Sequence, residues 1–221
     1  SVPWVAPGPR MKEYVLSLKA IWDSFQNGTP LRFQGNHYNF SLMTPPFSPG
    51  PIDYPPPKIF TAAVGPYMFR LAGEVSDGLL PHGFMTAKYM DEVGLPNLEK
   101  GLKKSGRTLK DIEIGTGGFL VMGENEEELG KAFEAARTRI AFYGSTPAYR
   151  PVLDAEGWGD LQPELNALSK TGAIMEMIAK VDERMLATLA VRGTPEECAA
   201  ELHRRFGDLT DRVCTYFPGY D

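Results

Sequence analysis

The chain has 221 residues, of which 43% are hydrophobic and 23% charged, a composition typical of a globular protein with a sizeable core. Its formal net charge is −5 and its Lys and Arg residues are scattered, so we expect no nucleic-acid partner. No apolar run approaches the roughly 18 residues needed to cross a bilayer, so we expect no association with a membrane.

A long amphipathic helix is the first predicted element. Apolar residues recur at helical spacing over residues 10–27, and Asn27-Gly28 is a typical helix end. Residues 28–57 form a proline-rich segment with two short runs, LRFQG and HYNFSL, that suit one hairpin. We expect this segment to be a surface excursion from the fold.

Strands and helices alternate in the next part of the chain. Four strands are predicted, at IFTAAV (59–64), GLLPH (78–82), IEIGTGGFLVM (112–122) and RVCTYF (212–217). Helices are predicted to begin at Pro66, near Thr86, near Glu126 and at Thr194. This alternation indicates a parallel sheet, and four such units are half of an eight-stranded barrel.

A helical insertion is predicted over residues 146–189, before the last helix. That helix has a clear start, because Thr194 and Glu197 form a capping box with Pro195 at the first helical position. The glycine run GTGG at 115–118 lacks the lysine and hydroxyl of a phosphate-binding loop. We interpret it as a site of close packing or a bulge.

The strand IFTAAV ends in a glycine-proline turn. Gly65 allows close backbone approach, and Pro66 presets the helical conformation of the next element. A phosphate group or a flat ring can lie against such a helix N-terminus. Turns of this kind also connect strands to helices without any ligand, so both interpretations stay open from these residues alone.

Longer motifs carry a family resemblance. The run PPKIFTAAVGPYMFRLAGEVSDGLLPH (56–82) resembles the second-half signature of the luciferase-like monooxygenase superfamily. PRMKEYVLSLKAIW and TLAVRGTPEECAAEL resemble the motifs that flank it. AFYGSTPAYRPVLDAEGWGDL (141–161) resembles a mycobacterial-type branch of that superfamily that uses coenzyme F420, a 5-deazaflavin.

The resemblance implies an α/β protein with the TIM-barrel-like (β/α)8 luciferase fold. It covers the C-terminal two thirds of the family, so the chain is expected to supply only strands five to eight plus the insertion helices. The first residues, SVPWVAPGPR, lack an initiating Met and suggest a processed, trimmed or partial chain. We expect residues 1–221 to form a single domain.

The resemblance also implies site residues. The positions that match the cofactor-contacting turn of the family, where small side chains let a ring or a phosphate tail come close, are Ala62, Ala63, Gly65 and Pro66. His82 follows a strand at the catalytic rim of the inferred barrel and is the candidate catalytic residue, with Gly83 beside it allowing close approach of the cofactor. A histidine satisfied within its loop is the alternative. Tyr149 and Arg150 are candidates to meet the substrate or the cofactor tail, with helix-end packing as the alternative.

Three functions compete on this basis. The first is an oxidoreductase that passes a hydride between coenzyme F420 and an organic small-molecule substrate. The second keeps the fold but uses FMN and molecular oxygen, as a monooxygenase. The third is a non-catalytic half-barrel whose open edges are covered by a second copy or by a chain that supplies the missing half.

Cysteine and histidine positions argue against a metal site. Cys198 and Cys214 lack CxxC or Cys/His spacing, and we interpret both as buried thiols of a cytoplasmic protein. The histidines, His37, His82 and His203, lie in three unrelated segments, so no metal is predicted.

Overall fold

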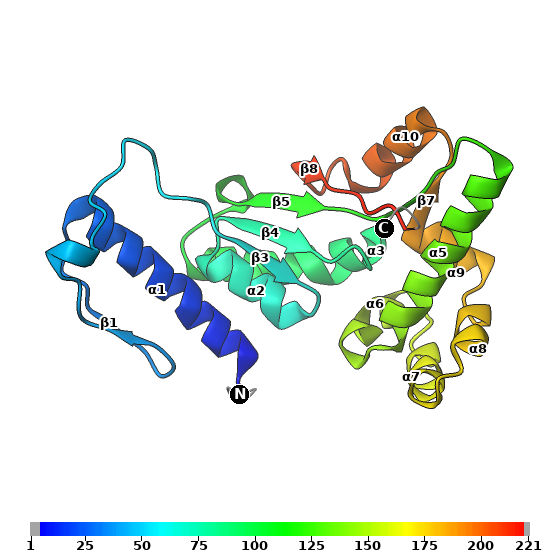
Figure 1. Ribbon diagram of the computed structural model, residues 1–221, viewed down its shortest axis with the longest axis horizontal. Helices are drawn as coiled ribbons and strands as arrows, with labels where there is room; N and C mark the ends of the chain where they lie inside the picture. The colour runs from blue at the N-terminus through cyan, green and yellow to red at the C-terminus, as the bar shows by residue number, and fades with distance from the viewer. Residues whose placement is uncertain (1–4, 219–221) are drawn as a thin grey trace.

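The computed structural model describes residues 5–218, and at its centre is a sheet of four parallel strands in the order β3-β4-β5-β8 (Figure 1). The strands are β3 (Phe60–Ala63), β4 (Gly78–Pro81), β5 (Glu113–Thr116) and β8 (Arg212–Val213). Phe60 pairs with Gly78, which in turn pairs with Glu113. The strands therefore start along one edge of the sheet and end along the opposite edge, which confirms the parallel α/β arrangement expected from the sequence.

Helices cover one face of this sheet. They are α2 (Pro66–Val75), which packs on β3 and β4, and α4 (Leu95–Lys104), which packs on α2. Ala63 and Leu79 are buried in the core that α2 contributes to, whereas Ala62 and Leu80 are exposed. Because successive side chains of a strand point to opposite faces, the face of the sheet away from α2 is open.

Short elements connect β4 to β5 around α4. They are α3 (Ala87–Tyr89), a π-helical turn (Met90–Gly94) and a 3₁₀ turn, η3 (Leu109–Asp111). The helix expected near Thr86 begins there, because the Thr86 hydroxyl accepts the Tyr89 N–H at 3.1 Å. Tyr89 then lies in the centre of the core, fully buried.

The glycine run splits the third predicted strand into two. Its second half is β6 (Phe119–Val121), which pairs in parallel with β7 (Ala190–Arg192), a strand that the sequence did not predict. A methyl group at Gly117 would overlap the carbonyl of Cys214, so close packing accounts for this glycine. The predicted strand at residues 212–217 was too long, since only β8 and a single bridge between Phe119 and Tyr216 form there.

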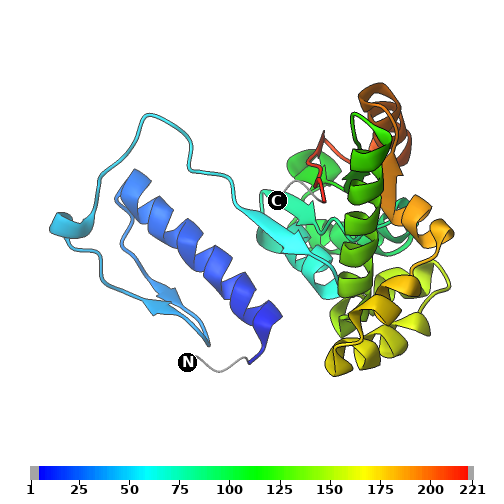
Figure 2. The ribbon, with the colours of Figure 1, turned by 45° about the vertical axis from the view of Figure 1, so that its right-hand side comes forward.

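The chain begins with α1 (Pro7–Asn27), which ends as predicted at Gly28 in the left-handed region (φ 66°). The predicted hairpin is β1 (Phe33–Gln34) paired with β2 (Asn39–Phe40), followed by a 3₁₀ turn, η1 (Pro45–Phe47). The Glu13 carboxylate of α1 accepts the N–H groups of the hairpin turn at 2.7 to 3.3 Å. In Figure 2, α1 lies between the sheet and this hairpin, so residues 28–57 run over the outside of α1.

The remaining helices gather beside the sheet. They are α5 (Glu126–Ser145), α6 (Arg150–Ala155), α7 (Leu161–Thr171), α8 (Ile174–Ala179), α9 (Glu183–Leu189) and α10 (Pro195–Phe206), with a 3₁₀ turn, η4 (Pro147–Tyr149), between α5 and α6. Thr194 and Glu197 form the predicted capping box of α10. Helix α5 contacts β6, and its buried residues Ala136 and Ile140 belong to the same core as residues of α2 and β4.

Two other features bear on the sequence-based expectations. Cys198 is buried as expected, but Cys214 is exposed, because it lies beyond β8 where the strand pairing has ended. Within residues 5–218, no helix combines the length and the apolar character that crossing a membrane requires.

Candidate functional site

Two turns meet at the edge where the strands of the sheet end. Gly65 and Pro66 follow β3, and His82 and Gly83 follow β4. The His82 N–H donates to the Ala63 carbonyl oxygen at 3.1 Å, which fixes the second turn beside the first. The candidate residues of both turns, far apart in the sequence, therefore form one continuous rim.

Neither glycine of this rim is required by the protein's own packing. Gly65 has an ordinary extended backbone (φ −88°), and neither Gly65 nor Gly83 has a left-handed φ. A Cβ atom built on either residue would meet no atom within 4 Å. The missing side chains leave open space along the rim, which a flat ligand can occupy.

The first turn of α2 opens onto the same space. Pro66 is the first helical residue, and the Gly65 carbonyl oxygen accepts the N–H groups of Met68 and Phe69 at 3.0 and 3.4 Å. The amides at the N-terminus of this ten-residue helix provide a partial positive charge that suits an anionic group. Ala62 lies exposed on the open face of the sheet, whereas the side chain of Ala63 faces the helices and is buried.

His82 packs against two neighbouring tyrosine rings. Its ring centroid is 4.6 Å from that of Tyr143 on α5 and 4.9 Å from that of Tyr149 on η4. The Phe84 N–H donates to His82 Nδ1 at 3.0 Å, so in the neutral imidazole the proton is on Nε2. Burial lowers the pKa of His82, which favours this neutral form. His82 is therefore prepared to donate a hydrogen bond from Nε2 rather than to carry a charge.

The tyrosines around His82 form an aromatic cluster with Phe84 and Phe119. The Tyr149 and Phe84 rings are 5.5 Å apart, and the Tyr143 and Phe119 rings stack at 6.1 Å. Burial, together with the neighbouring Tyr143, raises the pKa of Tyr149, so its hydroxyl remains a donor at neutral pH. Sequence reasoning did not identify Phe84 and Phe119, because buried aromatic residues in loops and strands look like ordinary core.

Arg150 lies outside this cluster. Its Nε is 3.5 Å from Asp154 Oδ1, one turn further along α6, and its side chain is half exposed. The structure thus brings together the predicted residues Gly65, Pro66, His82, Gly83 and Tyr149 at the rim and leaves Arg150 in an ion pair on the surface of a helix.

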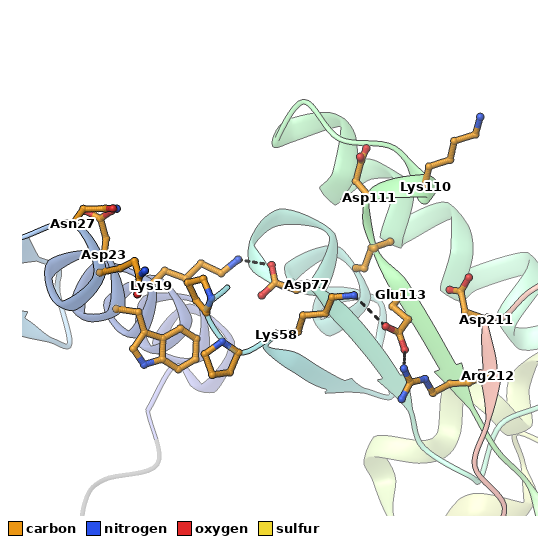
Figure 3. Close-up of a pocket in the computed structure, with 15 residues that line it drawn as sticks. Lys19, Asp23, Asn27, Lys58, Asp77, Lys110, Asp111, Glu113, Asp211 and Arg212 are labelled. Atoms are coloured by element: carbon orange, nitrogen blue, oxygen red, sulfur yellow. Dashed lines mark hydrogen bonds and ion pairs between the residues drawn. The ribbon is translucent and has the colours of Figure 1, made fainter. Parts of the chain in front are cut away.

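A large polar pocket of about 960 Å³ lies at the opposite edge, where the strands start (Figure 3). Most of its charged groups already have partners. Lys58 and Arg212 both point at Glu113, with Lys58 Nζ 3.4 Å from the carboxylate, and Lys19 is 2.9 Å from Asp77. Asp77 also accepts the Ile59 N–H at 2.9 Å. These side chains hold the strand starts together, so we exclude this pocket as the candidate site.

No metal centre emerges from the described residues. Among residues 5–218, no three His, Cys, Asp or Glu side chains are grouped so that they could hold a metal ion.

A family model and several known proteins match this chain. The family model for luciferase-like monooxygenases matches residues 1–212. An uncharacterized protein of Mycobacterium tuberculosis (strain ATCC 25618 / H37Rv) is 45% identical over 217 residues, which cover 98% of this chain and 64% of that protein. A 5,10-methylenetetrahydromethanopterin reductase of Methanolobus tindarius is 27% identical over 206 residues, which cover 91% of this chain and 58% of the reductase. The chain thus spans less than two thirds of the length of these relatives.

Solved structures share the fold. A coenzyme F420 dependent tetrahydromethanopterin reductase from Methanopyrus kandleri matches with a TM-score of 0.67 and 21% identity, over 91% of this chain and 56% of that chain. An F420-dependent secondary alcohol dehydrogenase, in complex with an F420-acetone adduct, matches with a TM-score of 0.62 and 19% identity, over 97% and 58%. At these identities, the two likenesses establish the arrangement of strands and helices alone.

Proposed function

This chain belongs to the luciferase-like monooxygenase family, and on that premise we propose that it is an oxidoreductase that binds coenzyme F420 at the Gly65-Pro66 turn. A hydride would pass between the deazaflavin ring and an organic substrate held beside His82. The fold is the family's α/β fold, with a parallel sheet and the rim at the strand ends, where barrel enzymes of this kind have their active sites.

The open space at Gly65 and Gly83 carries the proposal. Glycine costs conformational entropy, and here neither backbone conformation nor packing requires it. Close approach of a ligand to the backbone would explain why both positions are glycine. The residues present therefore fit a cofactor with a flat ring and an anionic tail, because the open rim adjoins the N-terminus of α2.

The side chains of the rim have distinct parts in this proposal. Ala62 and Gly83 would leave room for the ring, while Gly65 and the first turn of α2 would bind the phosphate of the tail. His82 Nε2–H and the Tyr149 hydroxyl would donate hydrogen bonds to a substrate oxygen, orienting the adjacent carbon over the ring. The deazaflavin, when bound, supplies the hydride chemistry.

Two observations favour hydride transfer by F420 over oxygen chemistry with FMN. The segment at residues 141–161 resembles the F420-using branch, and it contains Tyr143 and Tyr149, which contact His82. Methylenetetrahydromethanopterin reductases of three archaea, at 26 to 27% identity, are named as reductases rather than oxygenases. FMN is the alternative cofactor, and a binding experiment must distinguish it from F420.

We also propose that further strands cover the open face of the sheet in the assembled protein. Leu80 is 42% exposed on that face, and β3 lies at the edge of the sheet with β4 as its neighbour. An exposed parallel edge and an apolar face favour association. Either a second copy or a partner chain that supplies the remaining strands would serve. Sedimentation as a stable monomer with no tendency to associate would contradict this.

A fluorescence titration with oxidised coenzyme F420, run beside FMN, tests the cofactor assignment. The proposal predicts saturable binding of F420 and weaker binding of FMN. Tight binding of FMN alone would favour the monooxygenase, and binding of neither would refute the cofactor site in this chain.

A further inference from the structure

Tyr89 lies directly beneath the proposed cofactor turn, although it follows that turn by more than twenty positions in the sequence. Its ring is fully buried in the core and meets the ring of Phe69 edge-on at 6.4 Å. Phe69 belongs to the first turn of α2, where its N–H donates to the Gly65 carbonyl oxygen. Tyr89 therefore packs against the helix that starts at the turn.

The hydroxyl of Tyr89 reaches the turn itself. It donates to the carbonyl oxygen of Val64 at 3.0 Å. Val64 follows β3, and its carbonyl is therefore held by a side chain rather than by the next strand of the sheet. Burial raises the pKa of Tyr89 to about 12, so the hydroxyl stays protonated and remains a donor at any physiological pH.

Through the geometry of the peptide unit, this hydrogen bond determines the direction of the Gly65 N–H. In a planar trans peptide, the C=O of one residue and the N–H of the next point in opposite directions. The Val64 carbonyl points to the buried hydroxyl of Tyr89, so the Gly65 N–H points the opposite way, away from Tyr89. The Cβ position of the same residue borders open space. A backbone donor aimed this way adds to the anion-binding character of the α2 N-terminus.

Tyr89 also connects the two turns of the rim. It is positioned by the loop that leaves β4, because its own N–H donates to the Thr86 hydroxyl. That loop contains His82 and Gly83, while the hydroxyl of Tyr89 ends on the turn after β3. Tyr89 is thus a second link between the two turns, in addition to the hydrogen bond from the His82 N–H to the Ala63 carbonyl oxygen.

We propose that Tyr89 is a positioning residue for the cofactor turn: its hydrogen bond to Val64 fixes the Val64–Gly65 peptide so that the Gly65 N–H faces the phosphate of the cofactor tail. The inference rests on the proposed cofactor site. It adds a residue that touches neither cofactor nor substrate and acts only through the backbone of Gly65.

Substitution of Tyr89 by Phe tests the inference, with Tyr14→Phe as the matched control. Phe keeps the buried ring and removes only the hydroxyl, while Tyr14 is an exposed tyrosine of α1. Two probes separate the parts of the cofactor: coenzyme F420 itself, and the same deazaflavin without its phosphate-bearing tail. Tyr89→Phe should weaken F420 binding about fivefold, the factor expected for one lost hydrogen bond, and leave binding of the tail-less deazaflavin unchanged. Tyr14→Phe should change neither.

A merely structural role would give a different result. If Tyr89→Phe lowered the melting temperature but left F420 binding equal to that of the wild type, or weakened both probes equally, the inference would be wrong. Thermal unfolding of both variants provides the needed comparison.

A second measurement does not depend on any cofactor. In protein labelled with ¹⁵N-glycine, titration with inorganic phosphate should shift the Gly65 amide resonance saturably in the wild type and in Tyr14→Phe, and much less in Tyr89→Phe. An equal shift in Tyr89→Phe, or no shift in the wild type, would overturn the inference. If the wild type binds neither F420 nor FMN, the proposed function fails, and this phosphate titration alone decides the part played by Tyr89.

Discussion

Glycines serve opposite purposes in two regions of this molecule. Where α2 meets α4, a methyl group at Gly73 or Gly101 would overlap the backbone of the neighbouring helix. At the rim where the strands end, a methyl group at Gly65 or Gly83 would meet nothing. The first pair is accounted for by contacts within the protein and the second pair is not. The comparison separates glycines that let helices touch from glycines that leave room for a ligand.

The close contact of α2 and α4 also supports the rim. α2 carries the turn at its N-terminus and is buried along Phe69, Ala72 and Gly73. Arg107 completes this packing by donating to the carbonyl oxygens of Gly73 and Ser76 at the end of α2, at 2.6 and 2.7 Å. Arg107 thus holds the C-terminal end of α2, while the buried ring of Phe69 anchors its first turn in the core.

The largest expected effect is at the contact between the helices. Gly101→Ala should lower the free energy of unfolding by about 3 kcal/mol, because the added methyl group must displace the backbone of α2. Gly130→Ala is the control, since this exposed glycine of α5 has no atom near its Cβ position and alanine should stabilise the helix by up to ~1 kcal/mol. Urea unfolding measures both, and equal effects would refute the packing account.

A smaller effect, on a different property, is expected at the second turn of the rim. Gly83→Val should weaken binding of coenzyme F420 about tenfold, because the branched side chain fills the space proposed for the ring. The free energy of unfolding should change by no more than ~0.5 kcal/mol, as at other open positions. A loss of stability without a loss of affinity would assign Gly83 to the fold rather than to the site.

The smallest effect concerns the pH dependence of stability. Burial lowers the pKa of His82 below its ordinary 6.5, so the unfolded chain binds a proton at a pH where the folded protein does not. The free energy of unfolding should therefore fall as the pH falls through about 6.5, and His82→Gln should remove that part of the dependence. Chemical unfolding of both proteins between pH 5.5 and 8 provides the difference. Identical pH profiles would show that His82 titrates alike in the folded and unfolded chains.

Local patterns in the sequence were sufficient to predict much of the fold. Helical spacing predicted α1, which ends at Gly28 because that glycine adopts a left-handed backbone conformation. The alternation of strands and helices predicted the parallel sheet. The strand β7 was missed, because its three residues directly follow α9 and become a strand only by pairing with β6. The predicted strand over residues 212–217 was too long for a related reason, since only its first two residues find a partner strand in the main sheet.

The site was less accessible to sequence reasoning. The Gly65-Pro66 turn was visible, because strand, turn and helix are adjacent in the chain. The cluster around His82 was not, because Tyr143 and Phe119 come from a helix and a strand that only the tertiary fold brings to it. Arg150 lies in the segment that resembles the family motif. In the structure it pairs with Asp154, four residues further along the same helix, and this pairing gives no indication of a ligand.

The most direct test of the account is the affinity of Gly65→Val for coenzyme F420, measured by fluorescence beside the wild type. Valine adopts the extended backbone found at Gly65 without strain, and no atom of the protein lies within 4 Å of the position of its Cβ. The account predicts at least a tenfold weaker affinity with an unchanged free energy of unfolding. Wild-type affinity in this variant would contradict the central claim that the open turn at Gly65 is the cofactor site.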